Sequence, residues 1–158
     1  MDLIVNPTNP KDIAAVDRLF RDYAEWLKAD ICLYDFEEEM QRFPAPYVPP
    51  LGALFLATEN GRALGAVGVR PIADKICEMK RMYVRDEARG SGLGRRLAEA
   101  TLAWAKDAGY HVMRLDTLPK LTAARALYES LGFIPCAPYN VNPADKVLFY
   151  EKDLRPSP

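Results

Sequence analysis

Three glycines stand within five positions at Gly90, Gly92 and Gly94, and Arg89 and Arg95 flank them. A helical pattern begins directly behind these residues. Glycines leave successive backbone N–H groups accessible, and a helix N-terminus adds unpaired N–H donors and the positive end of the helix dipole. With two cations beside it, this stretch predicts a site for a phosphate or diphosphate. The alternative interpretation is that the glycines serve tight packing and that the arginines are solvated surface charges.

The spacing of the glycines excludes two common phosphate-binding motifs. The dinucleotide pattern GxGxxG needs a third glycine where Arg95 or Leu97 stands. The GxxxxGK[ST] loop has no matching spacing and no lysine in this stretch. The predicted site is therefore a strand-to-helix turn of another kind.

The elements around the glycines indicate how they are positioned. The run 75–84 alternates between two faces as a strand does, and it leads directly into the glycines. Upstream, two strand-like runs are joined by Asn60-Gly61, a pair that tolerates the positive φ angles of a tight hairpin turn. We expect strands at 3–5, 53–58, 63–70, 75–84, 111–117 and 147–154, and helices at 13–27, 93–108 and 122–131, with one short helix near 36–43.

This order of elements predicts a mixed α/β sheet with the glycine turn leaving its middle. The chain has 158 residues and is 49% hydrophobic, which suits one domain over 1–158.

The stretch Arg89-Gly90-Ser91-Gly92-Leu93-Gly94 is similar to the [RQ]xxGx[GA] signature of the Gcn5-related N-acetyltransferase (GNAT) family. Further segments agree in order and spacing across 53–154: the hairpin "ENGRALGAVGV", the strand "EMKRMYV" and the segment "ALYESLGF". The resemblance implies a single-domain α/β (α+β) fold. Its central sheet would be mixed, mostly antiparallel, splayed between its central strands and flanked by helices.

The resemblance also implies that acetyl-CoA is the co-substrate and that 77–132 forms its binding core. Backbone groups of Met82 and Val84 would pair with the pantetheine arm, and the Met82 N–H would polarise the thioester carbonyl. The residues implied to bind the cofactor are Met82, Tyr83, Val84, Arg89, Gly90, Ser91, Gly92, Leu93, Gly94, Arg95, Thr122 and Arg125. Leu121 departs from the asparagine that many members carry seven residues before the tyrosine of "ALYESLGF".

Two residues match catalytic positions of the family. Tyr128 occupies the place from which a tyrosine donates a proton to the departing CoA sulfur, although a tyrosine on a helical stripe also suits a core. Glu78 stands where some members carry a general base, although a glutamate beside Lys80 and Arg81 is often part of a surface charge pair. The other candidates for the base are Glu25, Asp116, Tyr139 and ordered water.

The segment 26–50 carries aromatic residues among acids and four prolines, and we expect it to cover the substrate pocket. Its aromatic residues serve either packing or substrate contact. The residues predicted to bind substrate are Tyr34, Phe36, Tyr47 and Tyr139.

Composition narrows the classes of partner. A net charge of −1 provides no cationic field for nucleic acid or an anionic membrane, and no apolar run reaches membrane-spanning length. One histidine and three separated cysteines do not suggest a metal site, and they favour reduced structural thiols in the cytoplasm.

The sequence therefore predicts a cytoplasmic N-acetyltransferase that moves an acetyl group from acetyl-CoA to a small-molecule amine. Two alternatives are a protein N-terminal or lysine acetyltransferase and a non-catalytic acyl-CoA-binding regulatory module. A homodimer is a further expectation, because the family often dimerises.

Overall fold

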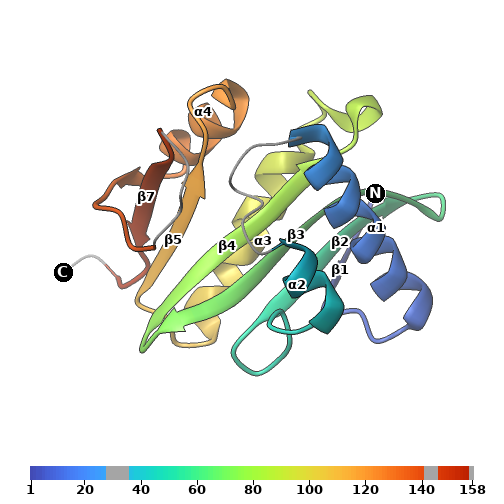
Figure 1. Ribbon diagram of the computed structural model, residues 1–158, viewed down its shortest axis with the longest axis horizontal. Helices are drawn as coiled ribbons and strands as arrows, with labels where there is room; N and C mark the ends of the chain where they lie inside the picture. Colours follow the sequence, from blue (N-terminus) through green and yellow to red (C-terminus); the bar gives the residue numbers. More distant parts are fainter. Residues whose placement is uncertain (28–35, 141–145, 157–158) are drawn as a thin grey trace.

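The computed structural model describes residues 1–27, 36–140 and 146–156. One seven-stranded sheet runs through it in the order β1-β2-β3-β4-β5-β7-β6 (Figure 1). The strands are β1 (Asp2–Val5), β2 (Ala53–Glu59), β3 (Arg62–Ala73), β4 (Ile76–Val84), β5 (Val112–Thr117), β6 (Ile134–Pro135) and β7 (Leu148–Asp153). The helices are α1 (Pro10–Leu27), α2 (Phe36–Arg42), the 3-10 helix η2 (Asp86–Ala88), α3 (Leu93–Asp107) and α4 (Thr122–Ser130).

The sheet is mixed and mostly antiparallel, as predicted. Its single parallel pair joins β4 to β5, and the other neighbouring strands run antiparallel. The β4–β5 pairing spans three positions and ends at Glu78 opposite Arg114. Beyond these residues β4 continues to Val84 and β5 to Thr117 without pairing, and Figure 1 shows the two strands diverging there. The predicted splay between the central strands is therefore confirmed.

Local sequence signals account for several elements. Asn60 and Gly61 adopt φ angles of 52° and 78°, which form the predicted hairpin turn between β2 and β3. Gly109 has a φ angle of 94° just after α3 and ends that helix, as expected of a glycine cap. The two-residue strand β6 was not predicted, because so short a run carries no periodicity.

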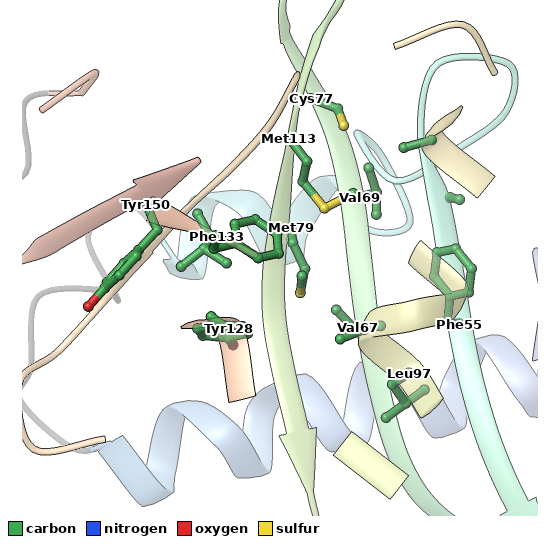
Figure 2. Close-up of a cluster of buried hydrophobic side chains, with 14 of the residues drawn as sticks. Phe55, Val67, Val69, Cys77, Met79, Leu97, Met113, Tyr128, Phe133 and Tyr150 are labelled. Atoms are coloured by element: carbon green, nitrogen blue, oxygen red, sulfur yellow. The ribbon is translucent and has the colours of Figure 1, made fainter. Parts of the chain in front are cut away.

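Helices cover both faces of the sheet (Figure 1). On the α3 face, one core cluster joins Leu97 to Cys77 and Met79 of β4, and it also includes Met113 and Tyr128. Figure 2 shows this cluster, with Tyr128 and Phe133 to one side of Met79, and Val67 and Phe55 to the other. The opposite face carries a second cluster formed by α1, α2, Tyr47 and residues of β2 and β3. None of the described helices combines the length and apolarity needed to cross a bilayer.

Tyr47 belongs to the second core cluster and packs directly against Gly68 of β3. Its side chain is 1% exposed, and a Cβ atom placed on Gly68 would lie 2.6 Å from Tyr47 Cδ1. The ring has little freedom to withdraw, because it contacts Phe20 edge to face and its hydroxyl donates a hydrogen bond to Glu39. The glycine at position 68 therefore follows from close packing.

We predict that Gly68→Ala destabilises the fold by about 1–3 kcal/mol, the usual cost of overpacking a filled core. Urea unfolding followed by circular dichroism measures this change. Gly94→Ala is the matched control, because its Cβ would lie 3.6 Å from Leu127 Cδ2, an ordinary contact distance. Equal stability of Gly68→Ala and the wild type would contradict this account of the core.

Candidate active site

A cavity of about 750 Å³ occupies the opening between β4 and β5. It is bounded by the second half of β4, the end of β5, the glycine turn before α3, the helix α4 and the last turns of α1. Because the strands separate here, the cavity reaches both faces of the sheet. Tyr128 lines it from the α3 face, where it belongs to the core. Lys80 lines it from the opposite face, because it follows Met79 of that core and successive side chains of a strand alternate between faces.

The glycine turn forms one end of this cavity. Gly90 and Gly92 have φ angles of 81° and 84°, so both need the left-handed backbone that glycine adopts without strain. Arg96 donates its backbone N–H to the Gly92 carbonyl in the first turn of α3. The N–H groups of residues 93–95 precede this bond and are the unpaired donors of a helix N-terminus. They suit an anion.

Two arginines line the same end of the cavity. The Arg89 guanidinium stacks 4.7 Å from the ring centre of Trp26 and pairs with Asp86. Arg95 donates a hydrogen bond to Ser130 Oγ at 2.6 Å. Two cations and the N-terminus of α3 thus converge on one surface, which is the charge pattern that a diphosphate requires. The glycine turn fits the pyrophosphate of acetyl-CoA on these grounds.

A bulge in β4 sets the direction of its last side chains. Register with β3 moves from Lys80 opposite Gly68 to Tyr83 opposite Ala66, so two residues of β4 oppose one of β3. Arg81 occupies the bulge with a φ angle of 61°. The bulge lies where β4 has already separated from β5, and Met82, Tyr83 and Val84 line the cavity beyond it.

Tyr128 reaches the cavity from α4. It is 7% exposed, and its ring meets Phe133 edge to face at 5.9 Å. The residue is therefore part of the core and also lines the cavity. Core packing of the Tyr128 ring therefore does not exclude its predicted role as a proton donor, because the residue still borders the cavity.

Glu78 lies away from the cavity wall. Its side chain is fully buried; one carboxylate oxygen accepts a hydrogen bond from Arg70 Nε at 2.9 Å, and the other accepts one from the Tyr139 hydroxyl. Burial, followed by the charge of Glu78, raises the pKa of Tyr139 above its ordinary value. The interpretation of Glu78 as part of a surface charge pair is wrong, because the Glu78 side chain is fully buried and only Arg70 is partly exposed. Its bonded oxygens favour a structural role over that of a general base.

Phe36 and Tyr47 also lie outside the cavity lining, contrary to their predicted contact with substrate. Both belong to the core cluster beneath α1 and α2. Phe36 lies under the Arg81 guanidinium at 5.0 Å, and Tyr47 and Arg81 both donate hydrogen bonds to Glu39. Burial and then Glu39 raise the pKa of Tyr47 above its ordinary value. Their aromatic rings serve packing, while Tyr34 lies outside the described residues.

The remaining predicted residues divide between two locations. Thr122 lines the cavity, as does Leu121. Ser91 donates a hydrogen bond from its hydroxyl to the Ala88 carbonyl, and Arg125 donates one to the Pro119 carbonyl at 3.0 Å. Neither Ser91 nor Arg125 is among the residues that line the cavity. Thr122 therefore lies where a bound cofactor could reach it, whereas Ser91 and Arg125 lie outside the lining.

Several lining residues were not predicted to belong to the site: Tyr23, Trp26, Leu27, Lys80, Arg81, Thr117 and Lys120. Asp116 also lines the cavity, and it was among the candidates for the base. The α1 residues carry no signal for this role, because their helical stripe is the pattern of ordinary packing. The alternation of β4 could have identified Lys80, since a lysine on a central strand is unusual unless it is paired or faces a ligand.

Comparison with known proteins identifies the family. Residues 13–133 match the acetyltransferase (GNAT) family, and an N-acetyltransferase of Schizosaccharomyces pombe is 35% identical over 92% of this chain and 90% of its own length. The chain therefore belongs to the GNAT family of acetyltransferases.

More distant relatives support the same placement. The aminoglycoside N(6')-acetyltransferase type 1 of Stenotrophomonas maltophilia is 26% identical over 86% of this chain and 90% of its own length. A Salmonella typhimurium acetyltransferase solved with its cofactor acetyl-CoA shares the fold, with a TM-score of 0.74 and 22% identity over 100% of this chain and 97% of that one. The predicted GNAT fold is confirmed.

Gly94 tests the cofactor assignment without backbone strain, since it begins α3 and its surroundings leave room for a side chain. We predict that Gly94→Val, whose branched side chain projects into the cavity, weakens acetyl-CoA binding by about tenfold or more, equivalent to roughly 1.4 kcal/mol. Isothermal titration calorimetry measures the affinity. Gly94→Ala should lose less, and an unchanged affinity for the valine variant would refute binding at this turn.

Glu78→Gln distinguishes a structural residue from a base. The substitution removes the charged acceptor of the hydrogen bond from Arg70, while Glu39 stays 3.8 Å from Arg70, so we predict a destabilisation of about 1–3 kcal/mol in urea unfolding. The pH profile of kcat/KM should keep its wild-type shape. A selective loss of activity at low pH, where the acceptor amine is protonated, would instead show that Glu78 accepts a proton during the reaction.

Proposed function

We propose that this protein transfers an acetyl group from acetyl-CoA to the amine of a small molecule by direct attack within a ternary complex. The observation that carries the proposal is the cavity itself. It begins at an anion-binding turn, passes Tyr128 and crosses the sheet where β4 and β5 separate. A donor on one side and an acceptor on the other can therefore meet between the two strands.

Acetyl-CoA supplies a thioester whose carbonyl carbon the amine nitrogen attacks, with cleavage of the carbon–sulfur bond. Arg89, Arg95 and the N-terminus of α3 hold the pyrophosphate. The Met82 N–H, just beyond the bulge, donates to the carbonyl oxygen and stabilises the negative charge that develops there. Tyr128 gives its hydroxyl proton to the sulfur as the thiolate leaves.

Asp116 is the best placed of the four candidate side chains for removing a proton from the amine. It lines the cavity, whereas Glu25, Glu78 and Tyr139 do not. Its carboxylate can hold an incoming ammonium group beside the opening, from which a proton passes to Asp116 or to water before attack. Asp116 thereby replaces Glu78 as the proposed proton acceptor.

A small acceptor is favoured by the walls on the α1 side. Tyr23, Trp26 and Leu27 border the cavity there, and Leu27 contacts Leu118 in a separate apolar cluster. The Stenotrophomonas relative is named for an aminoglycoside acceptor, which is also a small amine. The first residues of the segment 26–50, Trp26 and Leu27, would therefore border the acceptor and take part in covering the substrate pocket.

The test is a screen of amines with acetyl-CoA, monitoring free thiol, followed by Tyr128→Phe. This variant keeps the ring against Phe133 and removes the hydroxyl. We predict that kcat falls by about ten- to a thousandfold, the range for loss of a general acid, while acetyl-CoA affinity stays within about threefold of the wild type.

Other outcomes identify the alternatives. Unchanged turnover would restrict Tyr128 to packing. Wild-type protein that binds acetyl-CoA but acetylates no amine would support a regulatory module, and transfer to peptides alone would support a protein acetyltransferase.

A further inference from the structure

Two opposite charges face each other across the opening between the central strands. Lys80 of β4 and Asp116 of β5 both line the cavity, with 3.8 Å between Lys80 Nζ and Asp116 Oδ1. Their side chains are 9% and 6% exposed. Each lies two residues beyond the last paired position of its strand, Glu78 or Arg114. They therefore occupy the first open positions of the gap, on the sheet face opposite the α3 core.

The Lys80 ammonium and the Asp116 carboxylate are close enough to attract each other but too far apart to form a hydrogen bond. A separation of 3.8 Å exceeds the 2.7–3.2 Å of an N–H···O hydrogen bond. Asp116 Oδ2 accepts a hydrogen bond from Asn140 Nδ2 at 3.2 Å, whereas Asp116 is the one charged partner that Lys80 has among the described residues. An ammonium group carries three donors, and because Lys80 lines the cavity, a ligand bound there could accept hydrogen bonds from it.

The neighbouring buried charges are different. Glu78 accepts hydrogen bonds from Arg70 and Tyr139, and Glu39 accepts them from Tyr47 and Arg81. These carboxylates are engaged within the protein, and neither lines the cavity. The loosely paired charges are thus the ones that border the space where an acceptor would lie. Lys80 can bind an oxygen anion there while Asp116 binds a cation.

We propose that the acceptor is an amino-acid-like zwitterion whose carboxylate binds Lys80 and whose amine is held beside Asp116. This inference rests on the proposed transferase function and specifies its substrate class. An α-amino acid carries its ammonium and carboxylate groups on the same carbon atom, so it can lie head to tail against the protein pair. Each charge then gains a partner of opposite sign.

The same arrangement disfavours other small amines. An acceptor with several ammonium groups and no carboxylate would place positive charge beside Lys80 and Arg81, both of which border this part of the cavity. Like charges in a poorly solvated site repel strongly. A plain alkylamine would avoid that repulsion but would leave the lysine without its anion.

Matched acceptors test the proposal. The probes are L-amino acids, the corresponding L-amino acid amides, which keep the amine and lose the carboxylate charge, and the aminoglycoside kanamycin. With acetyl-CoA and thiol detection, we expect the wild type to favour the best acid over its amide by about tenfold or more in kcat/KM.

Lys80→Met removes the ammonium and keeps an unbranched side chain that is one atom shorter. We expect this variant to lower kcat/KM for the acid by about ten- to a hundredfold, chiefly through KM, while kcat/KM for the amide changes less than about threefold. Lys80→Arg keeps a cation and should retain the preference for acids. Calorimetry with acetyl-CoA provides the folding control, and Lys80→Gln replaces the methionine variant if binding is lost.

Each result decides a separate point. Acetylation of amides or kanamycin as efficiently as the acids, or an equal loss on both acceptors in Lys80→Met, would overturn this inference and leave the transferase function standing. Binding of acetyl-CoA without transfer to acids, amides or kanamycin would overturn the inference, and failure of the wider amine screen would then refute the proposed function too.

Discussion

The early end of the β4–β5 pairing is the constraint on which the site depends. Three paired positions hold these parallel strands together, and past Glu78 and Arg114 both continue unpaired. A sheet that stayed closed would fill this space with hydrogen bonds between strands. Because it opens, the backbone edges of both strands and the side chains of Lys80 and Asp116 border a cavity of about 750 Å³. The bulge at Arg81 comes just after the separation and directs the residues that follow it.

Buried charged groups link the elements beside this opening, where β4 and β5 are still paired. Glu78 on β4 is tied to Arg70 of β3 and to Tyr139 in the segment before β7, so its carboxylate links both sides of the β4–β5 junction. Glu39 on α2 joins Arg81 to Tyr47 in the same way. Such pairs contribute little net stability compared with well-packed apolar residues, but removing one partner destabilises the fold when the other charge is left buried without a partner. They specify one arrangement of α2 and β4 next to the cavity.

The aromatic residues illustrate why side-chain roles were harder to predict than elements. Phe36 and Tyr47 lie in a segment of irregular composition, which suits packing and substrate contact equally well. The structure shows that Tyr47 fills the space above Gly68, a neighbour 21 positions away in sequence that no local pattern connects to it. Trp26, the first residue of the same segment, was not among the predicted substrate contacts, yet it borders the cavity and stacks with Arg89. Periodicity reports which face a residue occupies, but not which partner lies opposite.

The sequence by itself determined the order of the main strands and helices, the Asn60-Gly61 hairpin and the glycine turn before α3. These features depend on short-range chemistry: alternation, positive φ angles and helix termini act within a few residues. Only the tertiary structure decided the different environments of Glu78 and Lys80, which lie two positions apart on one strand. Both point to the same face, but Glu78 stands where β5 is still paired and meets Arg70 and Tyr139, whereas Lys80 stands where β5 has moved away. The point at which two strands distant in sequence separate therefore determines that Glu78 is enclosed by the protein and that Lys80 borders the cavity.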